Sequence, residues 1–221
     1  MNQKMFQPLS FLKRDAAPGT AQPWLLVLMH GVGSNEQDLF GLAASVPSQF
    51  HVVSLRAPHA VGPGAYAWFQ FGVTPQGQRV INEAQEADSR AQVARTVSGL
   101  SLQLGVPPER VVLGGFSQGG IMALSLLLTQ PQHMHAAMVM HSRLLAEVLP
   151  FQAPPAQLQG KQLWVSAGTR DLVLPPAHAQ AVRALAQQWP LTLAYAEFPG
   201  AHEITPHELA QAMAWLQQLT V

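Results

Sequence analysis

The residues best suited to covalent chemistry lie in the stretch GGFSQGG, residues 114–120. Ser117 stands there in a G-x-S-x-G pattern formed with Gly115 and Gly119. The stretch follows an apolar run typical of a buried strand and opens a segment with helical character. A sharp strand-to-helix turn strains the backbone at the serine, and flanking glycines remove the resulting clashes. The hydroxyl would then lie at a helix N-terminus, which favours developing negative charge. A plain glycine-rich turn is the alternative interpretation.

A serine hydroxyl is a weak nucleophile without a base, and in this class of turn an acid and then a histidine follow it along the chain. The histidines that follow with a carboxylate in between are His178, His202 and His207. His178 and His207 fall within predicted helices. His202 lies in FPGAHEITP, between a strand and a helix, at the sheet edge where ligands bind in open α/β folds. His202 is therefore the candidate base, with an ordinary loop histidine as the alternative.

The candidate acid is Asp171, the only aspartate that follows Ser117. It lies in WVSAGTRDLVLPP, just past a predicted strand. Glu147 and Glu197 are less well placed, because one falls in an irregular segment and the other inside a strand. A turn aspartate paired with Arg170 is the alternative interpretation. The serine, the acid and the histidine all fall on strand-to-helix loops on one side of the predicted sheet, so the three assignments support one another.

A serine nucleophile also needs N–H donors for the oxyanion. One is expected from the residue after the nucleophile, Gln118, and one from an earlier strand-to-helix loop. The stretch LMHGVGSNEQDL provides such a loop, and Val32 lies between two glycines that free its backbone to turn. Val32 and Gln118 are therefore the candidate oxyanion donors. A glycine-rich turn with a capping asparagine is the alternative interpretation of the loop that carries Val32.

Short, nearly continuous apolar runs alternate with helical patterns, as in a parallel sheet buried on both faces. The predicted strands are 24–29, 50–57, 110–116, 136–142, 161–168 and 191–198, with a weaker one around 4–13. The predicted helices are 36–46, 85–104, 119–130, 177–188 and 206–218. Two irregular segments interrupt the pattern: 58–82, rich in Gly, Pro and aromatics, and 147–160. With no convincing linker or internal repeat, a single α/β domain over residues 1–221 is expected, with a mostly parallel sheet and helices on both faces.

Composition narrows the function classes. Of the 221 residues 48% are hydrophobic and 11% charged, and Lys+Arg and Asp+Glu are both 12, which gives a formal net charge of zero. No basic block suggests nucleic-acid binding. The absence of cysteine excludes disulfides and thiolate sites. No signal peptide and no apolar run of about 20 residues is present, so a cytoplasmic protein without stable membrane insertion is expected. The uncharged surface is compatible with a homodimer.

Several motifs together resemble the phospholipase/carboxylesterase family, which includes bacterial carboxylesterases and acyl-protein thioesterases. They are LMHGVGSNEQDL, RAP, AWF, GGFSQGG, GTRDLVLP and GAHEITP, and the resemblance covers about residues 20–216. It implies an α/β-hydrolase fold with no large cap domain, no metal and no cofactor. By motif match it gives Ser117 as nucleophile, Asp171 as acid and His202 as base, with oxyanion donors at Val32 and Gln118.

The sequence departs from the family pattern at three positions near these motifs. Arg143 stands where a glycine is frequent, Gln70 where an aspartate is frequent, and Ala201 in place of a second glycine before the histidine. Substrate preference is therefore the least transferable property. The aromatics of AWF, Trp68 and Phe69, are candidates for an acyl-pocket wall, and anchoring of a loop to the core is the alternative.

The function expected from these observations is a serine carboxylesterase that hydrolyses esters of short-to-medium acyl chains through an acyl-enzyme. An acyl-thioesterase or lysophospholipase would use the same triad, and the leaving group stays open. A non-catalytic binding protein of the same fold is a further alternative, although a complete set of catalytic parts argues against it. The HMH stretch at 133–135 could suggest a metal site, but no carboxylate set accompanies it. The expected partner is a small ester or thioester.

Overall fold

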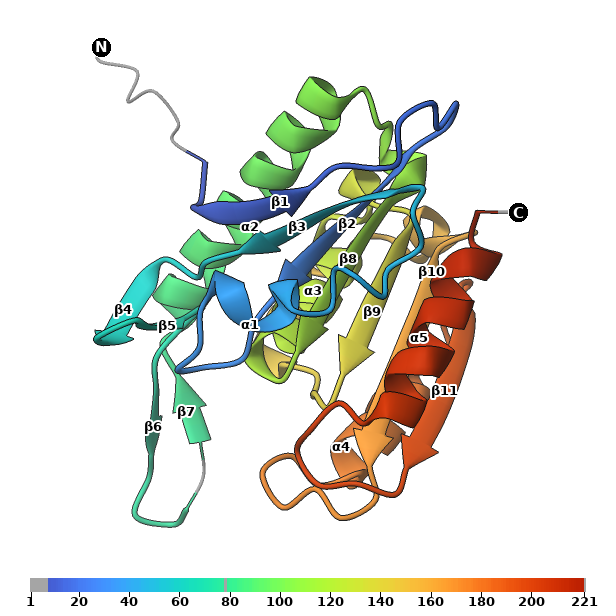
Figure 1. Cartoon of the computed structure of the whole chain (residues 1–221). Coiled ribbons are helices and arrows are strands. Elements are labelled where there is room, and N and C mark those ends of the chain that lie inside the picture. The colour runs from blue at the N-terminus through green and yellow to red at the C-terminus, as the bar shows by residue number, and fades with distance from the viewer. Residues whose placement is uncertain (1–7, 78, 221) are drawn as a thin grey trace.

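The computed structural model describes residues 8–77 and 79–220 and has a seven-stranded sheet at its centre (Figure 1). The strand order is β1-β3-β2-β8-β9-β10-β11. All neighbouring strands are parallel except β1 and β3, which are antiparallel. The strands are β1 (Phe11–Arg14), β2 (Trp24–Met29), β3 (Phe50–Leu55), β8 (Val111–Phe116), β9 (Ala136–Met140), β10 (Gln162–Gly168) and β11 (Thr192–Phe198). The predicted mostly parallel sheet is thus confirmed, and the strands expected between residues 24 and 198 end within two residues of their predicted ends.

The weaker N-terminal strand, predicted around residues 4–13, overlaps β1 in its second half. Its first part, up to residue 7, lies outside the described residues. β1 is short and only partly buried, as is common for a strand at the edge of a sheet. Edge strands lack the continuous apolar run that marked the inner strands, which explains the weaker signal.

Helices cover both faces of the sheet. They are α1 (Glu36–Phe40), α2 (Glu83–Leu104), α3 (Gln118–Thr129), α4 (Ala177–Ala186) and α5 (Pro206–Gln218). Apolar residues of α2, α3 and α4 share one core cluster with one face of the sheet. Those of α1 and α5 share a second cluster with the other face. In the described part of the chain, no helix is long and apolar enough to cross a membrane.

The prediction of a helix over residues 36–46 was wrong in its second half. The helix ends at Phe40, and the chain continues as tight turns in which Leu42 N–H donates to the Leu39 carbonyl over 3.0 Å. Leu39, Ala43 and Val46 are nonetheless all buried in the second core cluster. A series of turns can present apolar residues at nearly helical spacing, so the pattern alone did not distinguish the two.

The segment 58–82 is more ordered than the predicted irregular loop. It contains two antiparallel hairpins: β4 (His59–Gly62) with β5 (Ala65–Ala67), and β6 (Phe71–Val73) with β7 (Arg79–Ile81). Strands of three or four residues are too short to produce a readable alternation. The β6–β7 hairpin projects at the end of the molecule towards which the arrow of β9 points (Figure 1). The segment 147–160 forms two short 3₁₀ turns, Ala146–Phe151 and Pro155–Leu158.

Candidate active site

Ser117 lies at the sharp turn between β8 and α3. Its backbone has φ 54° and ψ −117°, a conformation that is costly for a residue with a side chain. The glycines around it are required by close backbone contacts. A Cβ on Gly115 would lie 2.2 Å from the Gly119 carbonyl carbon, and one on Gly119 would lie 1.9 Å from the Met29 carbonyl oxygen. The turn is therefore packed directly against the end of β2, and only glycine fits on both sides of the serine.

Two further loops come together at the same edge of the sheet. Asp171 follows β10, and His202 follows β11, the strand that pairs with β10. Arg170 N–H donates to the Gly200 carbonyl over 2.9 Å, which fixes one loop against the other. A Cβ on Gly168 would lie 2.3 Å from the Ala201 carbonyl oxygen, so the close approach depends on that glycine.

The structure brings Ser117, His202 and Asp171 into one chain of hydrogen bonds. His202 Nε2 lies 2.9 Å from Ser117 Oγ, and His202 Nδ1 lies 2.6 Å from Asp171 Oδ2. The ionised carboxylate can only accept, so Nδ1 carries the hydrogen and Nε2 is left to accept from the serine hydroxyl. Ser117 and Asp171 are buried, whereas His202 is partly exposed. This is the geometry in which a histidine removes the proton of an attacking serine.

Asp171 is held by four hydrogen-bond donors. Its Oδ1 accepts from the N–H groups of Val173 and Leu174, each over 2.8 Å. Its Oδ2 accepts from His202 and, over 3.2 Å, from Nδ1 of His141. Burial by itself raises the pKa of Asp171, but the donors from His202, Leu174 and His141 outweigh that effect and hold the pKa below its ordinary value. The carboxylate is therefore charged at neutral pH.

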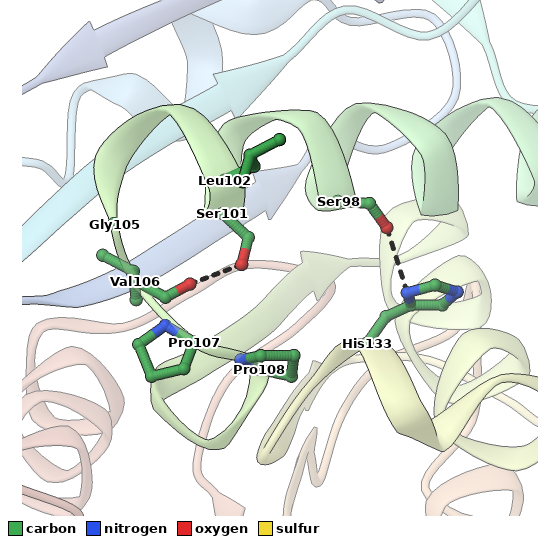
Figure 2. Close-up of a pocket in the computed structure, with 8 residues that line it drawn as sticks. All are labelled: Ser98, Ser101, Leu102, Gly105, Val106, Pro107, Pro108 and His133. Atoms are coloured by element: carbon green, nitrogen blue, oxygen red, sulfur yellow. Dashed lines mark hydrogen bonds between the residues drawn. The ribbon is translucent and has the colours of Figure 1, made fainter.

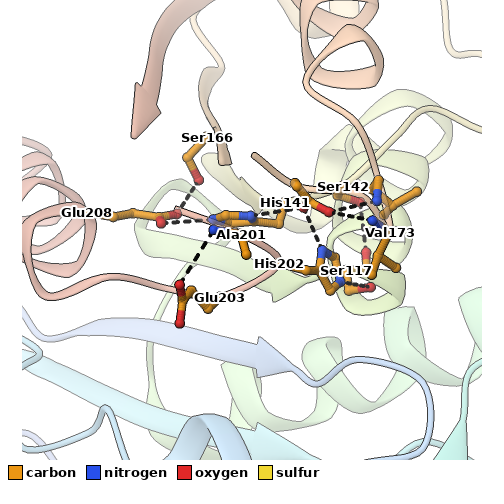
Figure 3. A network of polar contacts seen from close by, with 11 residues as sticks. Ser117, His141, Ser142, Ser166, Val173, Ala201, His202, Glu203 and Glu208 are labelled. Atoms are coloured by element: carbon orange, nitrogen blue, oxygen red, sulfur yellow. Dashed lines mark hydrogen bonds and ion pairs between the residues drawn. The ribbon is translucent and has the colours of Figure 1, made fainter. Parts of the chain in front are cut away.

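His141 extends the hydrogen-bond chain into the interior and was not foreseen from the sequence. Its Nε2 lies 2.9 Å from Glu208 Oε2, and Glu208 Oε1 accepts from Ser166 Oγ over 2.6 Å (Figure 3). Both ring nitrogens of His141 face carboxylate oxygens, so both carry hydrogens and the ring is an imidazolium. Burial lowers the pKa of His141, but the bonds and charges of Glu208 and Asp171 outweigh burial and raise the pKa above its usual value.

A usable signal for this group was present. His141 comes directly after β9, at the same sheet edge as the triad loops. It precedes Asp171 in the chain, so the expected order of serine, acid and histidine excluded it. Glu208 lies in the first turn of α5, where the Glu208 N–H donates to the N-cap hydroxyl of Thr205 over 3.2 Å. Its carboxylate is aimed inward, which no local pattern indicates.

The two candidate oxyanion donors both lie beside Ser117. Gln118 is the first residue of α3, so its N–H has no partner within the helix. Val32 lies in the loop after β2, and among the described residues no group accepts a hydrogen bond from its N–H. Gly31 in the same loop approaches the serine so closely that a Cβ there would lie 3.4 Å from Ser117 Cβ. Val32, Gln118 and Ser117 line the same cavity, as is expected of oxyanion donors and a nucleophile.

A buried histidine fixes this loop. Ala57 N–H donates to His30 Nε2 over 3.1 Å, and His30 Nδ1 lies 2.7 Å from the Gly31 carbonyl oxygen. Nε2 accepts and Nδ1 donates, so the ring is neutral, in agreement with a pKa lowered by burial. His30 is therefore a structural residue that holds the loop in place.

The two aromatic residues of AWF have different surroundings. Trp68 is fully buried, and its indole N–H donates to the His30 carbonyl over 2.9 Å. The Gln118 side chain accepts from Trp68 N–H over 2.8 Å and donates to the Phe69 carbonyl over 2.6 Å. Phe69 lines the cavity at the serine, whereas Trp68 is not among its lining residues. Trp68 thus anchors the loop, and of the two rings only that of Phe69 lines the cavity.

The cavity beside Ser117 has a volume of about 110 Å³. Its wall is mostly apolar and combines residues from the β6–β7 hairpin, the start of α3 and the loop after Asp171. Its lining residues are Val32, Phe69, Phe71, Arg79, Ile81, Ser117, Gln118, Ile121, Arg143, Val173 and Leu174. A small apolar space next to a reactive oxygen suits one short hydrocarbon group.

A larger cavity of about 420 Å³ lies at the opposite end of the molecule, by the C-terminal end of α2 (Figure 2). It contains a second serine–histidine contact, in which Ser98 Oγ lies 3.0 Å from His133 Nδ1. Within residues 8–77 and 79–220 no carboxylate is bonded to this histidine, and Ser98 Oγ also donates to the Ala94 carbonyl over 2.9 Å. The contact therefore lacks the parts that activate a serine, and size alone does not make this cavity the reactive one.

The residues that could bind a metal are already hydrogen-bonded to one another. His141, Asp171 and His202 offer candidate ligand atoms within 4.8 Å of one another. Asp171 Oδ2, which such a cation would need, accepts from both rings. The two histidines of the HMH stretch contact different residues. His133 lies against Ser98, and the ring of His135 packs against Trp24 with centroids 5.6 Å apart.

Comparison with known proteins identifies the class of protein. The carboxylesterase of Bacillus cereus has the same fold, with a TM-score of 0.81 at 22% identity over 96% of this chain and 94% of that one. MhqD of Bacillus subtilis is 23% identical over 89% of this chain and 94% of its own length. Acyl-protein thioesterase 1 of Gibberella zeae is 29% identical over 52% of this chain and 50% of its own length.

The protein is a serine ester hydrolase with an α/β-hydrolase fold and no large cap domain. It belongs to the phospholipase/carboxylesterase family, whose profile matches residues 16–220. The predicted family resemblance is thereby confirmed. At this level the activity is of the carboxylesterase or acyl-thioesterase type, and the particular substrate is a separate question.

Proposed function

We propose that this protein is a carboxylesterase that hydrolyses esters of short-to-medium acyl chains, with Ser117 as nucleophile, His202 as general base and Asp171 as the orienting acid. The observation that carries the proposal is the continuous hydrogen-bond chain from Ser117 Oγ through His202 to Asp171. The strained turn that presents the serine at the start of α3 adds to it.

In the first half of the reaction, Ser117 Oγ attacks the ester carbonyl carbon and its proton passes to His202 Nε2. Asp171 stabilises the imidazolium that forms, because its carboxylate already accepts from Nδ1. The carbonyl oxygen becomes an oxyanion that accepts from the N–H groups of Val32 and Gln118. Loss of one such donor typically lowers the rate by about 10²–10³-fold. The bond to the leaving oxygen then breaks, and Nε2 returns the proton to the departing alkoxide.

The second half releases the acid. Water attacks the acyl-enzyme carbonyl and gives a proton to His202 Nε2, which the bond-breaking step has left free to accept it. Collapse of this second tetrahedral species breaks the bond to Ser117 Oγ, and the proton on Nε2 restores the hydroxyl. Both halves use the same oxyanion donors and the same base.

The size of the cavity supports a preference for shorter chains. A space of about 110 Å³ holds a short acyl group, and a longer chain would extend over the rim formed by Phe71 and Val173, which are 41% and 48% exposed. An acyl-thioesterase or lysophospholipase would employ the same three residues, and the similarity to an acyl-protein thioesterase makes the thioester the first alternative to test.

The test is hydrolysis of p-nitrophenyl esters from acetyl to palmitoyl by the wild type and by Ser117→Ala. We expect turnover of the shorter esters and a loss of about 10⁶-fold in the mutant, as for removal of a serine nucleophile elsewhere. Full activity in Ser117→Ala would refute the assignment. An ethyl ester and an S-ethyl thioester of the same acid, compared at equal concentration, decide between the two leaving groups.

The matched control is Ser98→Ala. Ser98 also places its hydroxyl near a histidine nitrogen, but without an acid behind the ring. We expect this variant to keep full activity. A wild type that is folded but hydrolyses neither esters nor thioesters would favour the non-catalytic binding protein instead.

A further inference from the structure

Two arginines stand in the wall of the cavity that holds Ser117. Arg79 comes from β7 of the hairpin and Arg143 from the segment after β9. They are the only ionisable groups among the described residues that line it. A second cavity of about 390 Å³ is lined by the same two arginines and by His178, and it also shares Val173 and Leu174 with the first. The arginine pair therefore stands where the space at the nucleophile opens into an outer space.

Neither guanidinium is neutralised. Among the described residues no carboxylate lies within 4.0 Å of Arg79 or Arg143. The partner that Arg143 does have is the Leu144 carbonyl at 3.4 Å, and Arg79 lies over the Phe71 ring at 5.3 Å from its centroid. By contrast, the mostly buried Arg90 of α2 is paired with the buried Glu86 at 3.0 Å.

The electrostatic surroundings of Arg143 are also unfavourable for a positive charge. Burial lowers the pKa of Arg143, and the positive charge of Arg79 lowers it further, while Glu147 acts in the opposite direction without forming an ion pair. The pKa of His178 is lowered by burial and by both arginines. Asp171, the other nearby acid, is already engaged by His202 and His141. Arg143 is partly buried and Arg79 is exposed, and holding these two like charges in one cavity wall costs free energy unless an anion joins them.

The position of Arg143 relative to the nucleophile is fixed. The preceding residue, Ser142, is buried and donates through its hydroxyl to the Ser117 carbonyl over 2.8 Å. Arg143 thus starts from a backbone position tied to the turn that carries the reactive oxygen. Guanidinium groups bind carboxylate and phosphate oxygens through two parallel N–H bonds, which a neutral group does not match.

We propose that Arg79 and Arg143 form an anion subsite beside Ser117, so that the preferred substrates are esters that carry a carboxylate or a phosphate. The anion would occupy the boundary between the two cavities while the scissile carbonyl lies at the serine. This inference rests on the proposed esterase function and specifies its substrate class.

The test compares charged esters with neutral isosteres at fixed ionic strength. With the charge on the acyl side, the pair is ethyl hydrogen adipate and the ethyl ester of adipic acid monoamide. With the charge on the alcohol side, the pair is 4-acetoxybenzoate and 4-acetoxybenzamide, and 4-acetoxyphenyl phosphate adds the phosphate. The measured quantity is the ratio of kcat/KM for the charged ester to that for its neutral isostere. We expect this ratio to exceed about 10 in at least one arm, since a hydrogen bond to a charged group is stronger than one to a neutral group.

Four variants test the assignment to these arginines. Arg143→Gln and Arg79→Gln should each lower the ratio several-fold, and the double variant should bring it close to one. Arg143→Lys keeps the charge but loses the planar fork, so it should retain part of the preference and show that a fall in Arg143→Gln is not a folding defect. The control is Arg110→Gln, which removes the same charge at the other end of β8 and should leave the ratio unchanged.

The possible outcomes separate this inference from the proposed function. Equal turnover of charged and neutral esters by the wild type, unchanged in the variants, would refute the subsite and leave the esterase intact. If no ester is hydrolysed at all, the proposed function fails, and the anion subsite is then tested by measuring the binding of an anion. Calorimetric binding of adipate to Ser117→Ala that is lost on adding Arg143→Gln would then support it, and no binding to either protein would overturn it.

Discussion

The floor and the mouth of the active site are built in opposite ways. Beneath the triad, His141 and Glu208 are buried, and their charged atoms are hydrogen-bonded to protein partners. At the mouth, Phe71, Arg79 and Val173 are exposed, and Arg79 has no ion pair among the described residues. The floor must hold three groups in fixed positions, which a saturated network in a region of low dielectric does well. The mouth must accept an external molecule, and there Arg79 is left without a carboxylate partner in the described part of the chain.

The difference predicts where substitutions act. A change in the floor should lower stability because it leaves a buried charge or a backbone clash. A change at the mouth should leave stability nearly unaltered and change the affinity for substrate. The next three predictions test this contrast in order of decreasing effect.

Replacement of His141 by glutamine should have the largest effect on stability. It removes the positive charge between Asp171 and Glu208 and leaves two buried carboxylates facing a neutral amide. Breaking a buried ion pair typically costs about 3–5 kcal/mol, and we expect the free energy of unfolding in urea to fall by that amount. The control His207→Gln, at an exposed histidine of α5, should change it by less than about 0.5 kcal/mol.

The same variant gives a pH dependence of known sign. The pKa of His141 is raised in the folded protein, so its stabilising effect is fully present below the unfolded value of about 6.5 and is lost as the pH rises through the folded value. The difference in unfolding free energy between wild type and His141→Gln should therefore be largest near pH 6 and shrink towards pH 9. The lowered pKa of Asp171 adds no change in this range, because its effect is lost only well below pH 5. A difference that grows with pH would show that the ring is neutral.

The second prediction compares a glycine in the floor of the active site with a glycine at its mouth. Gly119→Ala should destabilise the protein by about 3 kcal/mol and abolish activity, because its Cβ would lie 1.9 Å from the Met29 carbonyl oxygen. Gly72→Ala in the β6–β7 hairpin meets no atom within 4 Å and should shift the unfolding free energy by less than about 0.5 kcal/mol. Thermal unfolding and ester hydrolysis of the two variants check this, and comparable losses in both would contradict the division between floor and mouth.

Removal of an apolar side chain at the mouth should have the smallest effect. Val173→Ser takes away methyl groups that are 48% exposed in the free protein and lie against the cavity. About 0.8 kcal/mol per buried methylene corresponds to roughly a four-fold rise in KM for p-nitrophenyl hexanoate. For the acetyl ester, too short to reach the rim, KM should not change. A fall in kcat with unchanged KM would mean that Val173 helps to position Asp171 instead.

The sequence alone determined the parts of this protein that depend on local chemistry. The buried strands follow from continuous apolar runs, and the place of Ser117 follows from the glycines that its turn requires. The order of serine, acid and histidine then led to Asp171 and His202, which the structure places within hydrogen-bond distance of one another and of the serine. Each of these inferences rests on residues close together in the chain or on loops at one edge of a parallel sheet.

The tertiary structure decided what depends on distant partners. His141 and Glu208 are 67 residues apart, and they meet because β9 ends beside the start of α5. Trp68 and Phe69 have different surroundings because the Gln118 side chain hydrogen-bonds to the backbone of both residues. Arg79 and Arg143 line one cavity because the β6–β7 hairpin folds over the loop after β9. The strands of this hairpin are too short to be recognised in the sequence. A sequence pattern records the preference of a residue for burial or for a turn, but the identity of its neighbour follows from the packing of the whole chain.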